Sequence, residues 1–222
     1  METNAMRRND AILLLAARSG DTESMRRALA AGADPNRREP PRYEGADQYA
    51  PLQLAAFFKR VEAVELLLSA GAHVNARTPV DNMTPLLLAT TGYSPDGRLC
   101  KRAHRALILA LIEAGADVDA GTGRGIMTVT PFGRALHDGH RFILLDLLRA
   151  GAAVSSIAPP ARDFRSASAW ALVDAVKKAG GFDEYAARQL DVHVSILTKC
   201  FGDRPRDVMS AVAEFYMLRG GY

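Results

Sequence analysis

A short segment that occurs four times constrains the fold of this sequence more than any other feature. It consists of Leu or Ile, one variable residue and Ala-Gly-Ala, and its glycines are Gly32, Gly71, Gly115 and Gly151. Successive glycines are 39, 44 and 36 residues apart. Self-similarity with a period of roughly 20 to 50 residues is typical of chains that stack small supersecondary units. The sequence therefore predicts a repeat array in which neighbouring units share a continuous core.

The apolar residues before each glycine have the spacing of an α-helix. In the first unit, Met25, Ala28 and Leu29 stand seven, four and three residues before Gly32, and the other units repeat this arrangement. Such spacing places the side chains on one helical face. A pair of small residues earlier in the unit, Ala16-Ala17, indicates a first helix that lets its neighbours approach closely. Each unit is predicted to hold two helices, with the glycine ending the second in a left-handed conformation.

A second marker begins the first helix of three units, as Ala50-Pro51-Leu52, Thr84-Pro85-Leu86 and Thr130-Pro131-Phe132. Together with the glycine segments, these residues resemble the ankyrin repeat, a unit of about 33 residues with a β-turn, two helices and a Thr-Pro-Leu-His-x-Ala signature. The resemblance implies an all-α ankyrin-repeat solenoid of helix-turn-helix units with β-turn fingers. We place the array at residues 1–156, with units at about residues 9–42, 48–81, 82–125 and 128–156.

The units depart from the family signature at several positions. No unit has His after Thr-Pro-Leu, where Leu14, Gln53, Leu87 and Gly133 stand instead. The family's Gly-His turn between the helices is intact as Gly139-His140, whereas Lys59-Arg60 replaces it in the second unit. The third unit has ten extra residues between its helices. Insertions in repeat arrays are expected in exposed loops, often on a binding face.

Residues 157–222 do not continue the repeat and are predicted to form three helices. The first spans residues 166–179, buries Trp170 with Leu172, Val173 and Val176, and stops at Gly180-Gly181. The second spans residues 182–201, and the third begins near Asp203. Because the end of a repeat stack has an apolar face that must be covered, these helices are predicted to form a C-terminal helical cap.

A second interpretation makes the C-terminal helices a docking segment. Residues Ser195 to Cys200 are similar to the start of a box through which some ankyrin proteins recruit a ubiquitin ligase, with Ile196 where that box has Leu. Arg204 stands where the box has an apolar residue, so the match is incomplete. The chain would then be a substrate adaptor of a ubiquitin ligase. A third interpretation is a structural subunit of a larger assembly.

Catalytic and cofactor motifs are absent from the sequence. It contains no P-loop and no Gly-x-Gly-x-x-Gly, Gly-x-Ser-x-Gly or His-Glu-x-x-His segment. Cys100 and His104 would share a helical face as half a zinc site, but no further ligands stand at a suitable spacing. His137 and His140 are three residues apart, and His140 is assigned to the turn between the helices rather than to a metal. We expect no enzyme activity, no metal and no cofactor.

Composition favours a soluble protein of a reducing compartment. The net charge is only +3, and the longest apolar runs are seven residues, against the roughly 20 needed to cross a bilayer. Two cysteines cannot form a disulfide framework. The sequence therefore predicts a cytoplasmic location, with the nucleus as the alternative, no membrane insertion and a chain that is monomeric on its own.

The resemblance implies that a partner protein binds the concave side, formed by the fingers and the first helices. The two positions after each small pair face this side, and the second unit has Phe57 and Phe58 there. At least one is expected to be exposed as an anchor, although one ring turned inward would fill a gap beside Ala55 and Ala56. The other predicted partner-binding residues frame the same groove and are Tyr43, Asp47, Tyr49, Asp81, Met83, Thr91, Arg124, Met127 and His137.

The insertion of the third unit carries a basic group of side chains. They are Arg98, Lys101, Arg102 and Arg105. Such a group could hold an acidic partner or phosphates, or form the solvated start of a helix. No aromatic residues are interleaved with it, so nucleic-acid binding is not expected. The predicted function is a non-enzymatic protein-protein interaction module.

Overall fold

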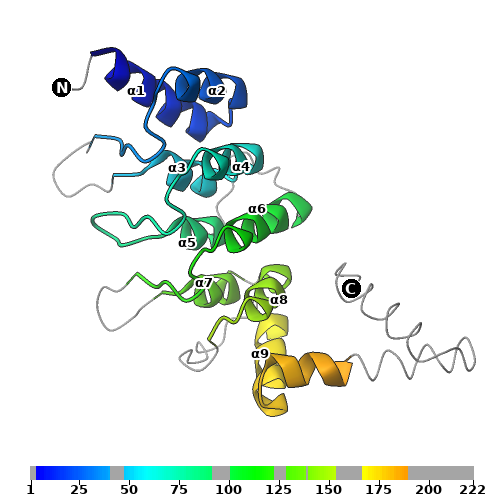
Figure 1. The fold of residues 1–222 in the computed structure, drawn as a ribbon. Helices are drawn as coiled ribbons and strands as arrows, with labels where there is room; N and C mark the ends of the chain where they lie inside the picture. The colour runs from blue at the N-terminus through cyan, green and yellow to red at the C-terminus, as the bar shows by residue number, and fades with distance from the viewer. Residues whose placement is uncertain are drawn as a thin grey trace, which may run out of the picture.

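The structure is a computed structural model that describes residues 4–40, 48–91, 101–122, 129–138, 140–153 and 167–189. This part of the chain is helical and contains no strand, which confirms the predicted all-α class. The helices, labelled in Figure 1, are α1 (Asn4–Ser19), α2 (Thr22–Ala30), α3 (Pro51–Phe57), α4 (Val61–Ser69), α5 (Pro85–Thr90), α6 (Lys101–Glu113), α7 (Pro131–His137), α8 (Arg141–Arg149) and α9 (Ala167–Ala179). Residues 182–189 are also helical.

The helices from α1 to α8 form successive pairs that stack along one axis (Figure 1). Helices α1, α3, α5 and α7 form one layer, and α2, α4, α6 and α8 form a second, because each helix contacts the helix two places further along the chain. The connections between pairs extend to one side as the fingers of the array. Helix α1 begins at Asn4, five residues before the start predicted for the first unit.

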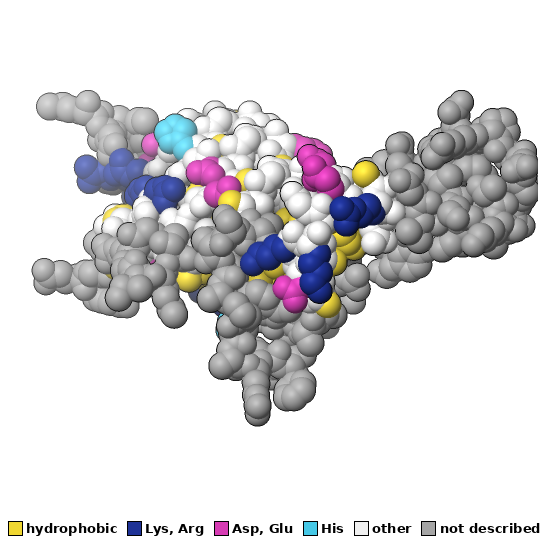
Figure 2. Space-filling model, turned by 90° about the horizontal axis from the view of Figure 1, so that it is seen from below, with side chains coloured by type: hydrophobic (Ala, Val, Ile, Leu, Met, Phe, Trp, Pro, Cys, Tyr) yellow, Lys and Arg dark blue, Asp and Glu magenta, His cyan; other side chains and the backbone are white. Residues whose placement is uncertain are grey.

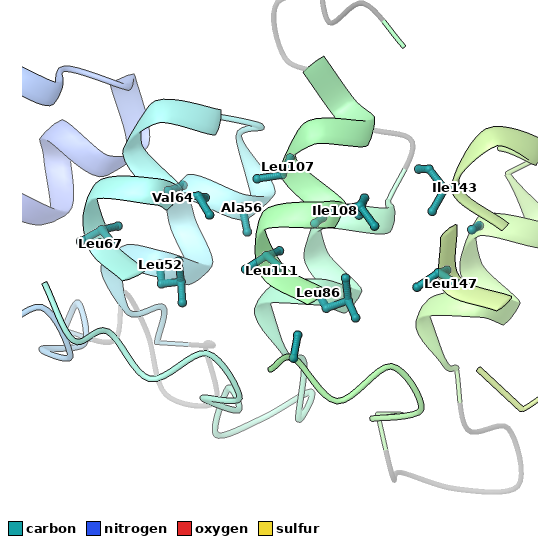
Figure 3. Packing of buried hydrophobic residues seen from close by; sticks show 14 of the residues in the cluster. Leu52, Ala56, Val64, Leu67, Leu86, Leu107, Ile108, Leu111, Ile143 and Leu147 are labelled. Atoms are coloured by element: carbon teal, nitrogen blue, oxygen red, sulfur yellow. The ribbon is translucent and has the colours of Figure 1, made fainter. Parts of the chain in front are cut away.

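One apolar core runs through all the pairs. Small residues at the small-pair positions, including Ala17, Ala55 and Ala56, are fully buried and let the layers approach closely. Burial of each larger side chain stabilises the fold by about 1.5–3 kcal/mol. Figure 3 shows part of the row that joins successive units, namely Leu52, Ala56, Val64, Leu67, Leu86, Leu107, Ile108, Leu111, Ile143 and Leu147.

The repeated glycines end the second helices as predicted. Gly32, Gly71, Gly115 and Gly151 have φ angles of 83°, 84°, 85° and 90°. After the first of them, the N–H of Ala33 donates to the carbonyl of Ala28 at 3.0 Å, and the same bond recurs in the other units. This is the hydrogen bond of a Schellman cap, which requires a left-handed residue and therefore favours glycine.

Gln53 stands in the second unit where the family signature has His. In the second unit, Gln53 is fully buried, and its Oε1 atom accepts from the N–H of Ala50 at 2.9 Å. Its Nε2 atom donates to the carbonyls of Ala76 and Met83 in the next finger, at 3.0 and 3.1 Å. Gln53 therefore fixes the entry to α3 and also joins two units.

Two ladders of side-chain hydrogen bonds connect the fingers. Asn36 accepts from the N–H of His73 at 2.7 Å and donates to the carbonyl of Gly71 at 3.2 Å, and Asn75 makes the equivalent bonds one unit later. Arg38 donates to the carbonyl of Arg77 at 2.7 Å. Arg77 in turn donates to the carbonyl of Gly121 at 2.9 Å. The fingers are therefore held in register by their own polar side chains.

Helix α9 lies against α8 at the end of the stack (Figure 1). It ends at Ala179, before Gly180, as predicted, and Leu172, Val173 and Val176 are buried in the common core. The side chain of Trp170 and all of residues 190–222, including the segment similar to a ligase box, lie outside the described residues. No helix among the described residues is long and apolar enough to span a membrane.

Candidate protein-binding surface

The predicted aromatic anchors lie at the C-terminal end of α3. Phe57 is the last residue of the helix and Phe58 is its C-cap. Their rings are in edge-to-face contact, with centroids 5.1 Å apart, and both side chains are half-buried. The guanidinium of Arg18 lies 5.0 Å from the centroid of the Phe58 ring, which is cation–π distance. The pair is a preorganised aromatic group that remains partly accessible.

The equivalent positions of the next two units extend this surface along the stack. Thr91 follows α5 and is half-buried, whereas His137 ends α7 and is exposed. The Nδ1 atom of His137 lies 2.9 Å from Oδ1 of Asp138. On the side of the third and fourth units, the surface beside the two phenylalanines is therefore polar.

The described finger residues differ in exposure. Tyr49 and Met83 are half-buried, and their carbonyls accept from the N–H groups of Glu39 and Thr78, at 2.9 and 3.0 Å. Asp81 is exposed. Four of the predicted finger residues lie outside the described residues, and they are Tyr43, Asp47, Arg124 and Met127.

The predicted basic group is divided between different environments. Arg98 lies outside the described residues, and Lys101 begins α6, where its side chain is not described. Arg102 is exposed on the first turn of the same helix. The guanidinium of Arg105 instead contacts both carboxylate oxygens of Asp146 on α8, at 2.6 and 2.9 Å.

Arg105 therefore has a structural partner inside the chain. Asp146 is 3% exposed, and it also accepts from Arg149 at 3.3 Å. The hydrogen bond to this carboxylate raises the pKa of Arg105. This pairing was not predicted from the sequence, because the two residues are 41 positions apart. Since its guanidinium is bound to Asp146, Arg105 does not belong to a basic surface for an acidic partner.

Charges of both signs alternate on the surface shown in Figure 2. Over the described part of this face, Lys and Arg side chains lie beside Asp and Glu side chains rather than in one continuous basic patch. Neutralisation of a phosphate backbone requires many cations on one face. The described part of this face therefore has no continuous basic patch of that kind.

A second feature lies beside Phe58, at the first end of the stack. A hollow of about 670 Å³ is lined by Ile12, Leu15, Ala16, Arg18, Ser19, Asp21, Ser24, Phe58 and Arg60. Ile12 and Leu15 are 47% and 68% exposed. Neither residue was predicted from the sequence, because Leu54 at the same place as Leu15 in the second unit is buried and the repeat pattern is the same in both units.

A buried polar cluster lies where the helices of the second, third and fourth units meet. Lys59 is 5% exposed, and its Nζ atom donates to the carbonyls of Leu88 and Ala89 at 2.8 and 2.7 Å and to Oγ1 of Thr91 at 3.3 Å. The Nε2 atom of His104 lies 2.7 Å from the same Ala89 carbonyl. Both side chains therefore cap the C-terminal end of the short helix α5.

Burial controls the protonation of this cluster. It lowers the pKa of Lys59 to about 7, with Arg134 acting in the same direction and Asp138 opposing it. It also lowers the pKa of His104 to about 4 and that of His140 below its usual value. The imidazole rings of His104 and His140 are in edge-to-face contact, with centroids 5.4 Å apart. Because His104 is neutral, its Nε2–H can donate to the Ala89 carbonyl.

Two members of the cluster hold the end of α5. The Lys59 amine and the His104 imidazole point to backbone carbonyls of that helix, whereas the buried Nε2 atom of His140 has no hydrogen-bond partner among the described residues. Among the described residues, no group of three or more His, Cys, Asp or Glu side chains is placed to hold a metal ion. Of the Cys100 and His104 pair, to which the sequence analysis assigned no metal, Cys100 lies outside the described residues.

Comparison with known families agrees with this geometry. A sequence model of ankyrin repeats, in three copies, matches residues 13–122, which covers the second half of α1, from residue 13, and the helices from α2 to α6. The α7–α8 pair follows the matched region and repeats the same helix pairing and glycine cap. No curated protein matches the sequence. The matched repeats, the stacked helix pairs and the glycine-capped second helices together show that the chain belongs to the ankyrin-repeat family.

Proposed function

We propose that this chain is a non-enzymatic binding module that holds a partner protein along the side formed by its first helices and fingers. Ankyrin repeats are in general protein-interaction modules. The observation that carries the proposal is the half-buried pair of Phe57 and Phe58 on that side. Interface hot spots are rich in aromatic residues, and a ring already fixed by its neighbours loses little entropy on binding.

The surroundings of the pair support the same function. The polar or exposed side chains of Thr91, His137 and Asp81 lie at the equivalent turns and in a finger, and Arg18 covers one face of the Phe58 ring. An apolar centre with a polar rim is the usual composition of a protein interface. We expect Phe57 and Phe58 to contact the centre of the partner, and the polar residues to determine which partner is accepted.

The test is a comparison of two double variants of the full chain. Phe57→Ala/Phe58→Ala removes the aromatic pair, whereas Glu62→Ala/Glu65→Ala changes two exposed residues of α4 in the other layer. Partners would be captured by crosslinking in cells and identified by mass spectrometry, and the affinity of each purified partner would then be measured by calorimetry. We expect the aromatic variant to weaken binding about tenfold or more and the control to leave it unchanged.

Thermal unfolding of both variants separates binding from folding. Because the two rings are only half-buried, the aromatic variant should retain a cooperative transition. Equal partner affinity in the folded wild-type and Phe57→Ala/Phe58→Ala proteins would contradict the proposed groove.

A further inference from the structure

The first end of the stack has an apolar stripe that each later unit buries. Leu15 on α1 is 68% exposed, whereas the residues at the same place in the next two units, Leu54 and Leu88, are 6% and 1% exposed. Those residues are covered because α1 packs beside α3, and α3 beside α5. Ile12 is 47% exposed, and the prolines that replace it in the later units, including Pro51, are buried. The stripe on α1 is therefore a copy of an internal packing surface, and no helix of the described part of the chain packs on it.

The second helix of the first unit does not continue this apolar surface. Ser24 on α2 stands where Ala63, Leu107 and Ile143 are buried in the later units. Further along α2, Arg27 pairs with Glu23 at 3.0 Å, and both side chains are exposed. The end face is thus apolar over α1 and polar over α2, so it suits one helix rather than the two helices of a further repeat unit or of a stacked second copy.

The hollow beside the stripe is bordered by positive charge. Arg18 and Arg60 line it, and Arg8 lies on the same helical face one turn before Ile12. Asp21 also lines the hollow, but its carboxylate accepts from the N–H and Oγ of Ser24 at 3.0 and 2.6 Å as the N-cap of α2, and these bonds lower its pKa. Arginines at both ends of an apolar stripe favour acidic residues at both ends of whatever lies on it.

We propose that the α1 end face binds one amphipathic helix of a partner protein, with apolar side chains on Ile12 and Leu15 and acidic side chains against the flanking arginines. The hollow between α1, Phe58 and Arg60 would take the largest apolar side chain of that helix. The bound helix would lie on α1 in the same way as α1 lies on α3, which is the packing that the array itself uses. This surface is separate from the proposed groove, although Phe58 borders both, and it does not depend on the groove function.

The experiment uses a phage-displayed library of single-helix peptides selected against the immobilised full chain. We expect the enriched peptides to carry apolar residues at i, i+3 or i+4 and i+7, with Asp or Glu at both ends. Binding of these peptides should weaken tenfold or more in Leu15→Glu. Peptide binding should also weaken in Arg18→Glu. The affinity of this variant should depend less on salt concentration than the affinity of the wild-type protein does.

Two matched variants control for changes elsewhere. Val129→Glu introduces the same charge at another exposed apolar residue, 38% exposed in the fourth unit, and should bind as the wild type does. Phe57→Ala, which changes the groove, should also retain the peptides, so loss of the groove function and loss of the end-face function remain distinguishable. The Leu15→Glu protein should unfold within a few degrees of the wild type, because Leu15 is mostly exposed.

Three outcomes would overturn the proposal. Enriched peptides could lack the apolar stripe or the acidic ends, or they could bind Leu15→Glu as tightly as the wild type. Light scattering could detect a dimer of the free chain that Leu15→Glu dissociates, in which case a second copy is the occupant. A selection without any enrichment would also count against a helix-binding face.

Discussion

The carbonyl oxygen of Ala89 accepts a hydrogen bond from Nζ of Lys59 at 2.7 Å, where the other units use a backbone N–H group. The equivalent carbonyls of Ala16, Ala55 and Ala135 accept from an N–H five residues later, at 2.9 to 3.0 Å. In the third unit the residue five positions after Ala89 is Ser94, which lies in the insertion and outside the described residues. The lysine of the second unit thus caps the C-terminal end of α5 in the third unit.

Lys59 should make stability depend on pH above neutrality. Its pKa is about 7 in the folded chain and near 10.5 in the unfolded chain, so the unfolded state binds more protons between these values. The free energy of unfolding of the wild type, relative to Lys59→Met, should therefore rise from pH 7 to pH 10, by at most about 1.4 kcal/mol per pH unit. Urea unfolding at four pH values measures this difference. A constant difference would mean that the three acceptors around Nζ keep the pKa near its ordinary value.

The Arg105–Asp146 pair should connect α6 to α8 energetically. Asp146 is 3% exposed, so Arg105→Met would leave a buried carboxylate whose remaining counter-ion among the described residues is Arg149. We expect a loss of about 2–3 kcal/mol in the free energy of unfolding, somewhat less than for a fully buried pair because Arg105 is partly exposed. Asp146→Leu should cost less than Arg105→Met, and the double variant Arg105→Met/Asp146→Leu should recover much of the loss. Additive losses in this cycle would argue against the coupling.

The glycine caps and the helix pairs were predictable because they depend on short-range rules. An Ala-Gly-Ala segment after an apolar helical stripe indicates a helix end with a left-handed residue at the glycine, and Gly71 has this conformation. The position of Phe57 and Phe58 followed in the same way from the repeat register. Their degree of burial did not, because it depends on Arg18 of the preceding unit.

The features that the sequence did not predict involve contacts between units. In the sequence, Lys59-Arg60 is only a departure from the Gly-His turn. The capping function of Lys59 depends on α5, which the fold places beside it. The sequence predicts Arg105 to be a surface charge, because its contact with Asp146 of α8 forms only in the folded array. Exposure of Leu15 is likewise a property of position, since the same residue type is buried at Leu54. Local pattern alone cannot separate these cases.

Two glycine substitutions should separate backbone strain from steric clash. Gly71 has a φ of 84° and open space around a Cβ atom, so Gly71→Ala should cost only the left-handed conformation, about 1 kcal/mol. Gly20 has a φ of 85°, but a Cβ there would lie 2.9 Å from Cδ of Arg60. We expect Gly20→Ala to lower the free energy of unfolding more than Gly71→Ala does. In an Arg60→Ala background the two losses should become equal, and an unchanged difference would rule out the clash with Arg60.

Asn75 should determine how strongly the second and third fingers are coupled. Its Oδ1 accepts from the N–H of Asp117 at 2.8 Å, and its Nδ2 donates to the carbonyl of Gly115 at 3.1 Å. Each bond contributes roughly 0.5–1.5 kcal/mol, so Asn75→Ala should lower the free energy of unfolding by about 1–3 kcal/mol. Hydrogen exchange should show faster exchange of the Asp117 amide. Asn36→Ala removes the equivalent bonds one unit earlier and serves as the control.

The location of the exchange distinguishes a ladder of local bonds from a general loss of stability. Because each unit of a repeat array contacts only its neighbours, Asn36→Ala should accelerate exchange at His73 and leave Asp117 unaffected, and Asn75→Ala should do the reverse. If both variants accelerate both amides equally, exchange proceeds through unfolding of the whole array, and the asparagines do not hold individual fingers. If neither amide changes, the finger bonds are replaced by water at no cost, and Gln53 and Arg77 remain as the groups that join the second and third units.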